Sequence, residues 1–123
     1  MSLRTPLSEA KGLGSAKEGA GHWWLQRLTA VALIPLVIWL AFGVATLGDA
    51  SYETVLAWLQ KPHVSVLLIL FVVATFYHTQ LGLQVIIEDY VHGWLKVVTL
   101  ILINFLCIVL AVVGIVALLK IFL

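Results

Sequence analysis

The stretch "VSVLLILFVVATFYHTQLGLQVII", residues 64–87, decides the fold class, because it runs for 24 residues without a charged side chain. A helix rises about 1.5 Å per residue, so about 20 apolar residues are enough to cross a bilayer. Backbone in lipid must satisfy its own hydrogen bonds, which favours a helix. We therefore expect a transmembrane helix that carries one histidine, His78, in its interior.

Two further uncharged runs flank this stretch, at residues 28–47 and 97–119. Only 11% of the residues are charged, against about 25% in a soluble domain. The first run is longer than the core of a signal peptide and follows a polar segment, so we expect it to be retained. The composition and the runs predict an all-α membrane protein. Its three transmembrane helices are expected over about residues 25–47, 64–88 and 95–120.

The predicted domain organisation is simple. Residues 1–24 are expected to form an N-terminal segment and residues 25–123 a three-helix anchor domain. Glycines make the first segment loose in this interpretation; they stand at positions 12, 14, 19 and 21. Pro35 lies in the first predicted span and can bend it. The lone Cys107 has no partner for an internal disulfide and is expected to be a small core residue.

The basic residues predict an orientation. Five of the seven lie on the side of the N-terminus, namely Arg4, Lys11, Lys17, Arg27 and Lys96. The other two are Lys61 and Lys120. The positive-inside rule then places the N-terminus in the cytoplasm and the C-terminus in the periplasm. A net charge of +1 gives no reason to expect nucleic acid as a partner.

His78 is the residue in the spans that most needs an explanation. It lies about 21 Å from one end of its predicted helix and about 13 Å from the other, and an ionisable group at that depth is costly. Three interpretations compete: a bond to a neighbouring helix, a proton relay, and an axial ligand of haem iron. Ala74 and Gly82 share its helix face and would clear space for a flat macrocycle, although small residues also permit close helix packing.

A haem with two histidine ligands would need a second imidazole at the same depth. The other histidines lie at span ends: His22, His63 and His92. The second ligand is therefore expected from another chain, and the three helices should bundle with a companion subunit.

Asp89 and Tyr90 follow the second span at the predicted cytoplasmic edge. Tyr90 is 12 residues beyond His78, which is about 18 Å on a continuous helix. A phenol there can anchor at the lipid interface, or it can donate a hydrogen bond to a quinone carbonyl. Arg27, at the same edge, can extend to lipid headgroups or pair with a haem propionate.

Two motifs resemble the small hydrophobic membrane anchor subunit of bacterial succinate dehydrogenase, respiratory complex II. The sequence "GHWWLQRLTAVAL", residues 21–33, enters the first span, and "FYHTQLGLQVIIEDYVH", residues 76–92, closes the second. The most specific element is a histidine followed, after ten residues, by Asp-Tyr. The resemblance covers nearly the whole chain.

The resemblance implies roles for five residues. His78 matches the axial ligand of haem b, and the companion anchor supplies the other ligand. Tyr90 matches the tyrosine that bonds ubiquinone, and Asp89 matches its acidic neighbour. Arg27 begins the family's Arg-x-Thr pattern and would lie near a haem propionate. His22 matches more loosely, as a further candidate for a propionate.

The resemblance also implies partners and a location. These are a flavoprotein subunit, an iron–sulfur subunit and the cytochrome b556 anchor, in the bacterial inner membrane. The chain has neither a dinucleotide fingerprint nor a cysteine cluster, so it would serve an oxidoreductase complex without being catalytic alone. Two alternatives stay open: an anchor of quinol–fumarate reductase, and a non-redox helical scaffold or small transporter subunit. Whether the whole complex forms a higher oligomer also stays open.

Overall fold

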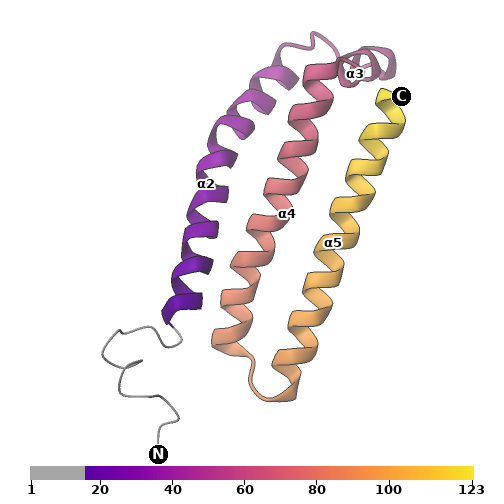
Figure 1. Cartoon of the computed structure of the whole chain (residues 1–123). Coiled ribbons are helices and arrows are strands. Elements are labelled where there is room, and N and C mark those ends of the chain that lie inside the picture. The colour runs from indigo at the N-terminus through magenta and orange to yellow at the C-terminus, as the bar shows by residue number, and fades with distance from the viewer. Residues whose placement is uncertain (1–15) are drawn as a thin grey trace, which may run out of the picture.

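Four helices make up the computed structural model, which describes residues 16–123 (Figure 1). They are α2 (Ala16–Ala45), α3 (Tyr52–Leu59), α4 (Pro62–Tyr90) and α5 (Trp94–Phe122). The three long helices contain apolar stretches sufficient to cross a membrane, at Ala20–Ala45, Pro62–Tyr90 and Trp94–Phe122. The predicted all-α architecture with three spans is therefore confirmed.

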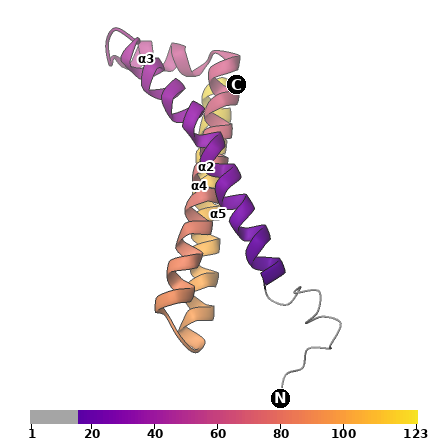
Figure 2. The same ribbon diagram turned by 90° about the vertical axis from the view of Figure 1, so that its left-hand side faces the viewer.

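The long helices form a single layer with α4 in the middle. Figure 1 shows them side by side, and in Figure 2 they lie one behind another, with α2 crossing α4 obliquely. α4 packs against α2 on one side and α5 on the other, whereas the backbones of α2 and α5 do not approach each other within residues 16–123. We call the end where α2 begins and α4 ends the Arg27 end, and the opposite end the α3 end.

The layer buries few side chains within the described residues. Only Ser65 and five apolar residues are buried: Val64, Leu68, Leu81, Ile87 and Cys107. The expectation for Cys107 is confirmed, since it is free and buried. Most other apolar side chains of the long helices remain half-buried or exposed. Such surfaces suit contact with lipid or with other helices.

The helix α3 was not expected, because no helix was predicted between the first two spans, at about residues 25–47 and 64–88. Ser51 caps it: Ser51 Oγ accepts a hydrogen bond from the Thr54 backbone N–H at 3.2 Å. The Ser51 backbone N–H donates to Asp49 Oδ1 at 3.0 Å and lowers the pKa of that carboxyl, helped by the Thr54 and Ser51 side chains. α3 lies across the end of the layer (Figure 2).

α2 begins earlier than the predicted span. Its helix starts at Ala16, so positions 19 and 21 are helical, contrary to the expected loose segment, while positions 12 and 14 lie outside the described residues. The sequence "AKEGA" that opens α2 contains good helix formers, which outweigh its one glycine. α2 also continues through Pro35 without a break.

A close contact joins α3 to α2. The Trp58 ring stacks on Trp39 with centroids 5.9 Å apart, and it fills the space beside Gly43. A Cβ at Gly43 would lie 2.8 Å from Trp58 Cζ2, which is closer than van der Waals contact allows. Glycine is therefore required at this position by close approach.

We expect Gly43→Ala to lower the free energy of unfolding by about 1–3 kcal/mol, because Trp58 must leave its stacked position. The measurement is the thermal unfolding of the purified protein in detergent. Gly21→Ala is the matched control: it lies in the same helix, its added Cβ meets nothing within 4 Å, and alanine is the better helix former. Equal stability of the two variants would contradict the packing of Trp58 against α2.

Candidate functional site

His78 faces α2 from the middle of α4 and is half-buried. Its Nδ1 lies 2.9 Å from Thr29 Oγ1, so a side-chain hydrogen bond joins α4 to α2 at this point. The Thr29 hydroxyl also lies 2.8 Å from the Leu25 carbonyl oxygen and 3.0 Å from that of Gln26. The Thr of the Arg-x-Thr pattern thus contacts the intramembrane histidine.

A shallow apolar groove runs beside His78. Its volume is about 400 Å³, and it is lined by His78 and five apolar residues of α2: Ala30, Leu33, Ile34, Val37 and Ile38. The groove is open on the outside, so a ligand lying in it would need a further surface to cover it. His78 is its one polar wall, which places an imidazole at the edge of an apolar surface.

The expected clearing on α4 is only partly present. A Cβ at Gly82 would lie 3.6 Å from Gln26 Nε2, so the bare surface at Gly82 is occupied by a side chain of α2. Here the small residue serves close helix packing, which was the competing interpretation. The open space near His78 lies instead along α2.

Arg27 lies on the groove side of α2, about one helical turn before the first groove residue, Ala30. It precedes Ala30 by three residues and Ile34 by seven, spacings that put all three on one helix face. Its side chain is exposed, and Cζ lies 5.3 Å from the centroid of the Trp23 ring. This cation–π contact holds the guanidinium beyond the end of the groove.

His22 lies on a different face from Arg27. The two residues are five positions apart, which is about 140° around a helix. His22 precedes Gln26 by four residues and Thr29 by seven, so the three polar residues share the face turned to α4. His22 Nε2 and Gln26 Oε1 are buried and have no hydrogen-bond partner within the described part of the chain.

Asp89 and Tyr90 end α4 at the Arg27 end. The helix is continuous from His78 to Tyr90, so the rise of about 18 Å between them applies. Both side chains are exposed, Tyr90 by 79%, and no hydrogen bond joins them in the described structure. Consecutive helical residues diverge by about 100°, so the carboxylate does not orient the phenol. Asp89, eleven residues after His78, is on the face that His78 occupies.

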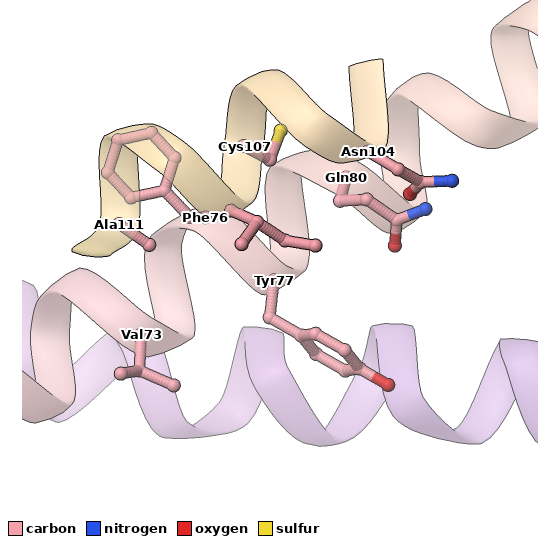
Figure 3. A pocket seen from close by; sticks show the side chains of 8 residues that line it. Val73, Phe76, Tyr77, Gln80, Asn104, Cys107 and Ala111 are labelled. Atoms are coloured by element: carbon pink, nitrogen blue, oxygen red, sulfur yellow. The ribbon is translucent and has the colours of Figure 1, made fainter. Parts of the chain in front are cut away.

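A second cavity lies between α4 and α5 (Figure 3). It measures about 250 Å³ and is mainly apolar, with the amides of Gln80 and Asn104 in its wall. Gln80 Nε2 donates to Gln84 Oε1 at 3.1 Å, and Gln84 Nε2 donates to Glu88 Oε1 at 3.0 Å. Neither glutamine was predicted as a site residue. The available signal was the spacing of four residues from Gln80 to Gln84 and again from Gln84 to Glu88.

Comparison with known proteins settles the family. A family model described as succinate dehydrogenase/fumarate reductase transmembrane subunit matches residues 1–119. The chain belongs to this family. The resemblance drawn from the two motifs is therefore confirmed, and the chain is a multi-pass membrane protein of the succinate dehydrogenase/fumarate reductase type.

Relatives that are membrane anchor subunits of succinate dehydrogenase support the family assignment. A succinate dehydrogenase hydrophobic membrane anchor subunit of Rickettsia conorii is 37% identical over 118 residues, 94% of each chain. That of Paracoccus denitrificans is 37% identical over 89 residues, covering 72% of this chain and 69% of the relative. A succinate dehydrogenase membrane anchor subunit of Reclinomonas americana is 42% identical over 80 residues, 63% of this chain and 67% of the relative.

Proposed function

We propose that this chain is the membrane anchor subunit of a succinate:ubiquinone oxidoreductase and supplies one axial ligand, His78, to a haem b. The observation that carries the proposal is an imidazole at the edge of an apolar groove, in the middle of an apolar helix. Bis-imidazole coordination suits low-spin haem iron, and an apolar wall suits a porphyrin ring. The groove is open, so the companion cytochrome b556 anchor would cover the porphyrin and supply the second ligand.

Arg27 is proposed to hold a haem propionate. It lies on the groove face of α2 and toward the Arg27 end, and its guanidinium is exposed beyond the groove. A guanidinium can bind a carboxylate with two parallel hydrogen bonds. His22 lies about 140° away around α2, facing α4, which makes Arg27 the better placed of the two candidates. The haem, when bound, supplies one-electron redox chemistry.

Tyr90 is proposed to bind ubiquinone at the Arg27 end. Its exposed phenol can donate a hydrogen bond to a quinone carbonyl, while the apolar surface of α4 accommodates the isoprenoid tail. Asp89 is exposed beside it and can exchange protons with water at the membrane edge. Quinone reduction consumes two protons, so a site near water meets a chemical need.

The basic residues support an orientation with the Arg27 end in the cytoplasm and the C-terminus in the periplasm. In a bacterium the membrane would be the inner membrane. The iron–sulfur subunit, which carries electrons from the flavoprotein subunit, would then dock at the Arg27 end, next to Tyr90. The descriptions of the relatives favour succinate oxidation over fumarate reduction as the physiological direction.

The test is to purify the assembly through a tag on this chain. We expect flavoprotein, iron–sulfur and cytochrome b556 subunits to co-purify, with about one low-spin b-type haem per copy of this chain. Untagged membranes carried through the same purification are the control. An assembly that contains no haem would support the non-redox scaffold instead.

A further inference from the structure

The Thr29 hydroxyl lies among three groups that can form hydrogen bonds with it. The Leu25 carbonyl oxygen is 2.8 Å away, the Gln26 carbonyl oxygen 3.0 Å, and His78 Nδ1 2.9 Å. The two carbonyls belong to the preceding turn of α2, and His78 belongs to α4. Thr29 is thus fixed against its own helix while it contacts the imidazole of another.

The number of protons decides the direction of each bond. A hydroxyl has one proton to donate and can accept through its lone pairs, whereas a carbonyl oxygen can only accept. If Thr29 donated its proton to His78, its oxygen would face two carbonyl oxygens at 2.8 and 3.0 Å with no proton between them. The hydroxyl proton therefore goes to the carbonyls of its own helix, as is common for threonine in helices.

The imidazole must then be the donor in its bond with Thr29. A neutral histidine carries one ring proton, and the bond at 2.9 Å requires it on Nδ1. Nε2 is left with its lone pair free to bind a ligand. His78 also lines the apolar groove, so the available nitrogen belongs to a ring that borders a ligand-sized space.

We infer that Thr29 is a positioning residue that holds His78 in the Nδ1–H tautomer and so prepares Nε2 to ligate haem iron. This inference rests on the proposed function, because it takes the ligand to be haem. Histidines that bind metals commonly donate their other N–H to an oxygen, which fixes the ring and raises the basicity of the ligating nitrogen. In this chain the oxygen comes from a neutral hydroxyl, which adds no charge to the interface between α2 and α4.

The experiment compares three variants in the purified complex. Thr29→Val replaces the hydroxyl with a methyl group of similar shape, and Thr29→Ser keeps the hydroxyl. Thr99→Val is the matched control, because the Thr99 hydroxyl donates in the same way to a carbonyl of its own helix, that of Leu95 at 2.7 Å, without an imidazole beside it. Haem affinity is measured by transfer to an apo-globin, and the haem midpoint potential by optical redox titration.

We expect Thr29→Val to weaken haem binding about tenfold, the lower end of the usual effect of such partners. The ligand becomes less basic, so ferric haem should be weakened more than ferrous haem. Each tenfold difference between the two raises the midpoint potential by about 59 mV. Thr29→Ser and Thr99→Val should match the unmodified complex within about twofold. Thr29→Ser keeps the hydroxyl that contacts His78, and Thr99→Val leaves the contact between Thr29 and His78 in place.

Two results would overturn the inference. One is an unchanged affinity and potential in Thr29→Val; the other is a loss in Thr29→Ser as large as in Thr29→Val. If Thr29→Val does not assemble, Thr29→Ala takes its place, and equal haem affinity in the alanine and serine variants overturns the inference. Normal haem in a His78→Leu complex would instead contradict the proposed function, so the two failures are distinguishable.

Discussion

Replacing His78 with leucine should weaken haem binding at least about tenfold and convert any retained haem from six-coordinate low-spin to five-coordinate high-spin iron. The reason is that the groove beside His78 has no other polar wall, so no side chain lining it can replace the lost imidazole. The measurement is the optical and electron paramagnetic resonance spectrum of the purified complex, with haem quantified per copy of this chain.

His63→Leu is the matched control for this experiment. His63 lies on the same helix, but it is exposed in the first turn at the α3 end and far from the groove. Its replacement should leave the haem content and spectrum unchanged. A low-spin spectrum of full intensity in the His78→Leu complex would remove the role that we propose for this residue.

Tyr90→Phe should lower kcat/KM for quinone by about 2- to 10-fold, because a hydrogen bond is typically worth about 0.5–1.5 kcal/mol. Phenylalanine keeps the ring, so the change isolates the phenolic hydroxyl. Succinate oxidation with a water-soluble artificial acceptor should persist, since that acceptor does not need the membrane site. The measurement is steady-state activity with ubiquinone and with the artificial acceptor in the same preparation.

Tyr52→Phe controls for the loss of an exposed phenol in general. Tyr52 is 76% exposed, close to the 79% of Tyr90, but it lies in α3 at the opposite end of the layer. It should leave both activities unchanged. Equal quinone activity in the Tyr90→Phe and unmodified complexes would contradict a quinone contact at this position.

The three spans could be predicted from the sequence because each depends on a single requirement, a long run without charge. The helix α3 was not predicted, since eight residues are too few for a hydropathy argument. Its signals were local: a capping serine, Ser51, with Glu53 in the first turn. The early start of α2 was missed because glycine received more weight than the residues around it.

The candidate site was less predictable than the spans. The depth of His78 follows from counting residues along the helix. Its partner Thr29 does not, because Thr29 is 49 positions away. The rotation of α2 relative to α4 decides which side chains of the two helices meet. The same rotation places Gln26 against Gly82 and opens the groove along α2. The divergence of the Asp89 and Tyr90 side chains follows from their adjacent positions only because α4 continues to Tyr90, beyond the predicted end of the span at about residue 88.

The central place of α4 has a consequence for cooperativity. Thr29 meets His78 on one flank of α4, and on the other flank a Cβ at Gly114 of α5 would lie 3.3 Å from Val72. At the α3 end, α3 and its C-cap link the outer helices: Trp58 stacks on Trp39 of α2, and Gln60 Nε2 donates to the Ile121 carbonyl oxygen of α5 at 3.3 Å. At the Arg27 end, by contrast, each outer helix is held by α4 alone, so either one can separate there locally without disturbing the other.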